Sequence, residues 1–148
     1  LGGIAGGAAV VGGAVQMVGF AVMSRKDNSV GQVLSIAFGT SMLQFKNIVK
    51  KPILWLPTII VSAVLGPVST LLFKVTTDYT GAGMGTSGLV GQFSTLSAMG
   101  YEWSVGVTIV LLHFVLPVLL VWLADELFRR KGWIQPGDLR LADLNKSI

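Results

Sequence analysis

The sequence predicts an all-α membrane protein with about three transmembrane helices and two re-entrant or broken-helix segments, the C-terminal portion of a larger polytopic protein. Hydrophobic residues make up 52% of the chain and charged residues only 12%, about half the charged share of a typical soluble domain. Long stretches also lack any ionisable side chain. A soluble helical bundle would instead carry charges along its outer face.

Three uncharged stretches are expected to cross the membrane, at residues 1–24, 52–73 and 103–124. The last two, about 22 residues each, reach roughly 33 Å as helices, enough for a hydrocarbon core of about 30 Å. The first opens without Met, a basic leader or a cleavage pattern. We therefore expect the chain to begin inside a membrane helix, with an N-terminal half missing.

The stretch at residues 30–45 is apolar but short, about 24 Å as a helix. It also carries polar and small residues that would be poor choices to face lipid. These are Gly39, Thr40, Ser41 and Gln44. We expect this segment to enter the membrane and return.

The basic residues favour that topology. If residues 30–45 return to the side from which they entered, every Lys and Arg except Lys74 lies on that side. If the segment crosses, Arg25 and Lys26 join Lys74. The positive-inside rule favours the first arrangement, which makes residues 1–128 a membrane domain and residues 129–148 a cytoplasmic C-terminal tail.

A second unusual stretch covers residues 79–101, which hold no charge but many glycines. The glycines are Gly81, Gly83, Gly85, Gly88 and Gly91. They argue against a regular helix through the first half of this stretch. Because irregular backbone at membrane depth needs protein or a water-filled cavity around it, we expect a second re-entrant segment from the opposite side.

The two interrupted segments share a short repeat, Gly-Thr-Ser-x-Leu followed by Gln-Phe, at residues 39–45 and 85–93. Its polar members are Thr40, Ser41, Gln44, Thr86, Ser87 and Gln92. Transporters build midplane binding sites from paired broken helices. These hydroxyls and amides donate and accept hydrogen bonds without net charge, which suits a neutral polyhydroxylated solute such as a sugar. The alternative is that they only cap helices and satisfy backbone groups.

Two further polar residues lie inside predicted spans. His113, four residues before Pro117, is either a ligand contact or proton relay, or a neutral side chain bonded to a carbonyl that Pro117 frees. Gln16 in the first span has a similar ambiguity, with a polar contact between helices favoured.

The remaining features have structural interpretations. Glycines repeated along the first span indicate tight helix packing. Trp55, Trp103 and Trp133 lie near span ends, where indole rings anchor at the membrane interface. The charges from Asp125 to Lys131 are interpreted as the solvated end of a helix.

Several kinds of chemistry find no support in the sequence. The chain has no cysteine, which excludes disulfides and thiolate chemistry. It also has no catalytic triad, metal-ligand cluster or nucleotide loop, so we expect no cofactor, no metal site and no catalytic residue. The basic residues cluster beside the spans, which indicates membrane orientation and not nucleic-acid binding.

Several runs of sequence together resemble a known family. They are residues 12–24, 39–44, 81–92, 111–117 and 131–139. They are similar to the C-terminal part of the enzyme IIC-like membrane proteins of the bacterial phosphotransferase system (PTS), the sugar-transporter subunit IIC family. The resemblance extends over nearly all of the chain.

This resemblance implies a permease component in the bacterial cytoplasmic membrane that moves a sugar inward, usually as a homodimer. A separate B component would phosphorylate the sugar, so the chain itself would be a transporter subunit and not an enzyme. The resemblance assigns no role to His113. Two alternatives stay open: a membrane receptor or regulatory scaffold with the same fold, and an ion- or proton-coupled transporter that uses His113.

Overall fold

The computed structural model describes residues 2–141 and confirms the all-α fold class, since these residues form no strand beyond one isolated bridge between Gly3 and Thr77. The α-helices are α1 (Gly3–Ser24), α2 (Val30–Leu34), α3 (Phe45–Lys50), α4 (Leu56–Leu71), α5 (Val90–Met99), α6 (Trp103–Val110) and α7 (Leu116–Arg130). Short 3₁₀ turns cover Ser41–Gln44, Pro52–Trp55 and Ser87–Leu89, and π-helical turns cover Ser35–Gly39 and Leu111–Val115. The last seven residues of the predicted tail lie outside the described residues.

Three helices of the described chain are long and apolar enough to cross a membrane, as predicted: Gly3–Ser24, Pro52–Leu71 and Trp103–Arg130. The third continues six residues past its predicted end at Ala124. The expectation that its charged end is solvated is wrong at Asp125, whose side chain is fully buried. Asp125 accepts hydrogen bonds from Arg129 at 2.9 and 3.0 Å, which provide the partner that a buried carboxylate needs.

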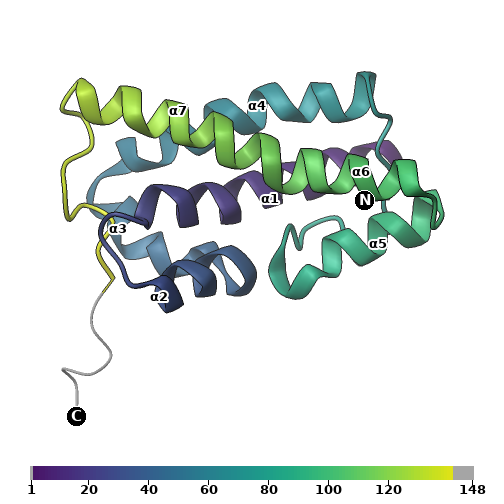
Figure 1. The fold of residues 1–148 in the computed structure, drawn as a ribbon, viewed down its shortest axis with the longest axis horizontal. Helices are drawn as coiled ribbons and strands as arrows, with labels where there is room; N and C mark the ends of the chain where they lie inside the picture. The colour runs from purple at the N-terminus through teal and green to yellow at the C-terminus, as the bar shows by residue number, and fades with distance from the viewer. Residues whose placement is uncertain (1, 142–148) are drawn as a thin grey trace, which may run out of the picture.

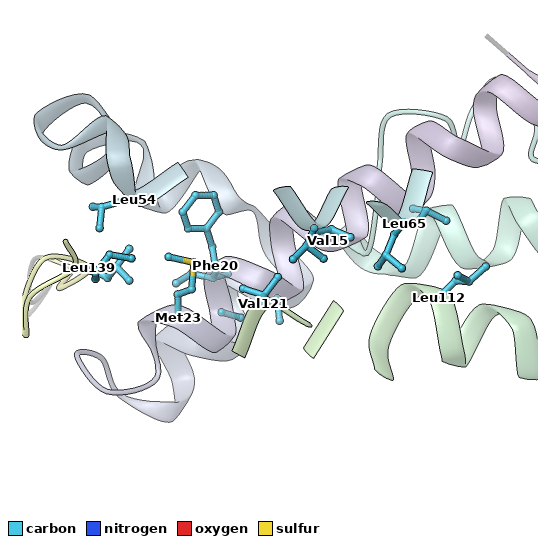
Figure 2. Packing of buried hydrophobic residues seen from close by; sticks show 14 of the residues in the cluster. Val15, Phe20, Met23, Leu54, Leu65, Leu112, Val121 and Leu139 are labelled. Atoms are coloured by element: carbon cyan, nitrogen blue, oxygen red, sulfur yellow. The ribbon is translucent and has the colours of Figure 1, made fainter. Parts of the chain in front are cut away.

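Helix α1 lies at the centre of the bundle, with α4 and α7 along one side and the interrupted segments along the other (Figure 1). Its apolar side chains interlock with those of the flanking helices (Figure 2). The glycines of α1 allow this close packing, because a Cβ at Gly7 would come within 2.0 Å of the Val75 carbonyl oxygen. One at Gly19 would come within 2.8 Å of the Thr58 methyl group. The predicted packing role is confirmed at Gly7, while Gly19 packs closely although it was not among the glycines predicted to do so.

The first interrupted segment runs inward as α2 and its π-helical turn, bends at Thr40, and returns through Ser41–Gln44 and α3. Both of its ends are tied to one stretch near the end of the described chain. The side-chain amides of Asn28 and Gln44 both donate to the Leu139 carbonyl, at 2.7 and 2.9 Å. The segment therefore returns to the end of the bundle from which it left.

The second interrupted segment lies toward the opposite end of the bundle. Residues 79–86 form successive turns without a regular helix, as their glycines predicted. The chain then continues through Ser87–Leu89 and α5, which joins α6 near the start of α1 (Figure 1). The tips of the two interrupted segments face each other beside α1 (Figure 1).

The two π-helical turns flank the region where the tips meet. The turn at Leu111–Val115 ends just before Pro117, which has no N–H to continue a regular helical ladder. The rings of Phe38 and Phe114, one from each π-helical turn, have centroids 6.3 Å apart. Wide turns of this kind are frequent at functional sites.

Candidate functional site

The two Gly-Thr-Ser tips bond directly to each other. The Thr86 hydroxyl donates to the Ala37 carbonyl at 2.5 Å, and the Ser87 hydroxyl donates to the Gly39 carbonyl at 2.9 Å. Both carbonyls belong to the last turn of the helix that runs from Val30 to Gly39, where the carbonyls have no partner within the helix. The second tip therefore caps the C-terminal end of the first half-helix.

Glycines bring the second tip against the middle of α1. Gly85 has φ +54°, and a Cβ there would come within 2.5 Å of the Gly13 carbonyl carbon. A Cβ at Gly13 would lie 3.0 Å from the Gly85 Cα, and one at Gly91 would lie 2.2 Å from the Gly85 carbonyl oxygen. Any larger side chain would push the tip away from α1.

A cavity of about 320 Å³ lies where the two tips meet α1. Its lining residues are Gly13, Gln16, Met17, Gly39, Thr40, Ser41, Met42, Gly83, Met84 and Ser87. Since α1 runs from Gly3 to Ser24, Gly13 places the cavity about halfway along that span. None of the lining side chains is ionisable.

Besides Ser87, which donates to the Gly39 carbonyl, two of the polar side chains in the cavity have defined hydrogen bonds. The Thr40 hydroxyl oxygen accepts from the Met42 N–H at 3.1 Å and caps the return turn, which leaves its proton able to donate. The Gln16 carbonyl oxygen accepts from the Trp55 indole at 3.0 Å and from the Thr58 hydroxyl at 2.9 Å. This confirms the predicted polar contact of Gln16 between helices, while the same side chain also lines the cavity.

The seven predicted site residues divide into two groups. Thr40, Ser41 and Ser87 line the cavity. Thr86, Gln44, Gln92 and His113 are buried and do not line it.

The two repeat glutamines have different partners. Gln44 binds the Leu139 carbonyl and accepts from Asn47 at 2.7 Å. Gln92 binds His113, with its amide nitrogen 2.9 Å from the imidazole Nδ1. The histidine is therefore bonded to a side chain and not to a carbonyl freed by Pro117. The second atoms of this pair, Gln92 Oε1 and His113 Nε2, are buried without a hydrogen-bond partner among residues 2–141.

Sequence reasoning missed the methionines of the cavity. Met17 comes from α1, while Met42 and Met84 stand within or directly beside the two Gly-Thr-Ser copies. The position of Met42 and Met84 next to the repeat was the available signal. Unbranched methionine side chains adapt to the shape of a ligand, so they belong to the description of the site.

Three candidate spans and a polar, uncharged cavity between two broken helices are the features of a membrane transport protein. The chain matches the family described as "Phosphotransferase system, EIIC" over residues 1–141 and belongs to it. It is therefore a membrane-embedded component of a phosphotransferase-type sugar permease, a transporter subunit and not a catalytic one. No curated protein and no solved structure matches the chain.

Proposed function

We propose that this chain binds a neutral polyhydroxylated solute in the cavity between the two Gly-Thr-Ser tips and passes it across the membrane. The observation that carries the proposal is the position of the cavity, which lies beside the midpoint of α1 and between two helix ends that do not cross the bundle. A transported solute must pass through this level of the membrane.

The size and chemistry of the cavity support a sugar. A volume of about 320 Å³ lies at the lower end of small-molecule sites, on the order of 300–1,000 Å³. The Thr40 and Ser41 hydroxyls can donate to and accept from the hydroxyls of a sugar, and the Ser87 oxygen, whose proton bonds the Gly39 carbonyl, can accept. Met17 and Met42 offer apolar surface for its C–H faces. The absence of charge from this lining disfavours an ionic solute.

Membership of the family supports the arrangement of partners and topology. We propose that a separate B component phosphorylates the sugar on the cytoplasmic side and that the complete permease is a homodimer. The C-terminal tail would then be cytoplasmic. This agrees with the positions of α3 and the C-terminal end of α7, which both carry basic residues and lie at the same end of the bundle (Figure 1).

The test is binding by the full-length protein in detergent. A panel of neutral sugars is screened for an increase in thermal unfolding temperature, because a ligand that binds only the folded state stabilises it. For the sugar that stabilises most, Ser41→Ala should weaken binding by about 2- to 12-fold, the loss of one net hydrogen bond. Ser104→Ala, an exposed position on α6, is the control. Equal affinity of the Ser41→Ala and wild-type proteins would contradict the proposed site.

One observation favours a second candidate, coupling to protons. His113 is fully buried, and its Nε2 has no partner among the described residues. Uptake into liposomes that depends on a proton gradient, and loses this dependence in His113→Gln, would support it. Uptake indifferent to both would exclude it. A receptor without transport is less favoured, because such a protein needs no cavity at half-height.

A further inference from the structure

Most cations at the end of the bundle formed by α3 and the end of α7 have partners. Asp125 pairs with Arg25 at 3.7 Å and with Arg129 at 2.9 Å. Glu126 pairs with Lys26 at 3.3 Å and Arg130 at 3.6 Å.

Two further cations at this end also have partners. Lys51 pairs with Asp138 at 2.6 Å. The Lys131 ammonium lies 4.9 Å from the centre of the Trp133 ring. Pairing is therefore the rule for cations at this end of the molecule.

Three cations at the same end differ from these in their pairing. Lys46, Lys50 and Arg140 form no ion pair with any carboxylate in the part of the chain that the structure describes. All three line one cavity of about 660 Å³. Lys46 and Lys50 are four residues apart on α3, so their like charges lie on one face and repel each other. An anion between them would remove that repulsion.

The cavity lies in the fork of the first interrupted segment. The inward arm contributes Gln32 and Ser35, and the return arm contributes Leu43, Lys46, Asn47 and Lys50. Arg140 and Leu141 complete the lining.

Hydrogen bonds hold the backbone of this last stretch in place. The Asn47 amide donates to the Arg140 carbonyl at 3.2 Å, and the Leu141 N–H donates to the Asn28 side chain at 2.7 Å. The guanidinium of Arg140 is therefore attached to fixed backbone beside the two lysines. Gln32, Ser35 and Asn47 add neutral hydrogen-bonding groups to the three positive charges.

The surface around the cavity is apolar. Val30, Leu34 and Phe38 repeat at four-residue spacing along the inward arm and are 77%, 52% and 42% exposed. Leu43, inside the cavity itself, is 44% exposed. A pocket with cations and hydrogen-bond donors next to exposed aliphatic side chains matches a molecule with an anionic head and a hydrocarbon tail. A soluble acidic protein would match the charges but not the apolar stripe.

We propose that this cavity binds the phosphate-bearing headgroup of an anionic phospholipid, with its acyl chains along the Val30, Leu34 and Phe38 stripe. Basic pockets at the membrane surface between helices recognise such headgroups, and phosphate oxygens accept charge-assisted hydrogen bonds from Lys and Arg. Because the fork opens behind the tip that carries Thr40, a lipid bound there would brace the two arms of that tip. The proposal does not depend on the identity of the transported solute.

The test compares lipid retention by two charge-matched variants of the full-length protein. The cavity variant carries Lys46→Gln, Lys50→Gln and Arg140→Gln, while the control carries Lys26→Gln, Arg130→Gln and Lys131→Gln. Each protein is purified with equal amounts of phosphatidylglycerol and phosphatidylcholine, and bound lipid is counted by native mass spectrometry. Wild type and control should retain phosphatidylglycerol preferentially, and the cavity variant should lose this preference by about tenfold or more.

Unfolding temperatures of all variants are measured, and the single variant Lys50→Gln replaces the triple one if the latter does not fold. An equal loss of preference in both triple variants would indicate a general charge effect and overturn the proposal. An unchanged preference in the cavity variant would also overturn it. A further arm adds inorganic phosphate to delipidated protein, and stabilisation equal to that by phosphatidylglycerol would assign the cavity to a soluble anion instead. If the cavity variant keeps its lipid preference but its sugar is no longer phosphorylated by a partner protein, the cavity would be assigned to a surface that binds that protein.

Discussion

The two Gly-Thr-Ser tips have nearly the same sequence but occupy different environments. Thr40 is exposed, lines the cavity and caps its own return turn through the Met42 N–H. Thr86 is fully buried, and its hydroxyl instead donates to the carbonyl of Ala37 in the other segment. The first tip thus presents polar groups to the cavity, while the second holds the first in place.

This difference shows that a repeated motif need not repeat its role. The glycines that open the two copies differ in the same way: a Cβ at Gly39 would meet nothing within 4 Å, whereas one at Gly85 would collide with Gly13. Substitutions at matched positions of the two copies should therefore have unequal effects.

The largest effect is expected for Gly85→Ala. The new Cβ would lie within 2.5 Å of the α1 backbone and would force an alanine to φ +54°. Overpacking and left-handed strain together predict a loss of stability on the order of 2–5 kcal/mol. The matched variant Gly39→Ala should be nearly neutral. Thermal unfolding of both variants in one detergent checks this, and equal unfolding temperatures would contradict the assigned roles.

A smaller effect is expected for Thr86→Val. Valine keeps the shape but leaves the buried Ala37 carbonyl without its partner, which costs about 1–3 kcal/mol. Thr40→Val removes an exposed cap and should cost less, about 0.5–1 kcal/mol. The same unfolding assay ranks the pair. If Thr40→Val were the more damaging variant, the first tip would be the structural one.

The leucines of the repeat give a third matched pair. Leu89 has φ +60°, whereas its counterpart Leu43 lies in an ordinary 3₁₀ turn. Left-handed backbone is unfavourable for leucine by about 1–2 kcal/mol. Leu89→Gly should therefore be neutral or stabilising by up to about 1 kcal/mol, and Leu43→Gly destabilising by about 0.5–1 kcal/mol. Destabilisation of similar size in both would contradict the strain at Leu89.

The smallest effect is expected at acid pH, for the ion pair between Lys51, which directly follows α3, and Asp138. Partial burial opposes the shift, but the hydrogen bonds from Lys51 and from the Gln135 N–H outweigh it and lower the pKa of Asp138 below its ordinary value of 3.8. The pair therefore stabilises the fold fully above pH 3.8, and this contribution of at most about 1 kcal/mol disappears as the pH falls through the lowered pKa. Asp138→Asn should flatten this part of the stability profile between pH 5 and pH 2. An identical profile in wild type and variant would exclude the ion pair as its source.

The sequence was sufficient to predict the spans and the interrupted segments. Long uncharged stretches indicate helices that can cross a membrane, and closely spaced glycines indicate where a regular helix is interrupted. It also located three cavity residues, Thr40, Ser41 and Ser87, through the repeat. It could not separate these from Gln44 and Gln92. The partner of each glutamine is a distant group, Leu139 or His113, that only the packed fold brings near.

Burial of charge was equally hidden from the sequence. Asp125 stands in a charged run that looks solvated, yet it is fully buried against Arg129. Of the residues that line the cavity from α1, Gln16 was identified as an ambiguous polar residue, whereas Met17 was missed. Apart from Gln16 the helix is apolar on all sides, so the sequence pattern does not indicate which face meets the tips.

The most direct test of the central claim is protection of a thiol at Ser41 by the transported sugar. The chain has no cysteine, so Ser41→Cys provides a single reporter in the cavity, with Ser104→Cys as the exposed control. The rate of maleimide labelling is measured with and without the sugar that stabilises the protein most. The account predicts that the sugar slows labelling at Ser41→Cys and leaves Ser104→Cys unchanged. If the labelling rate of Ser41→Cys is the same without sugar and with saturating sugar, the solute binds elsewhere.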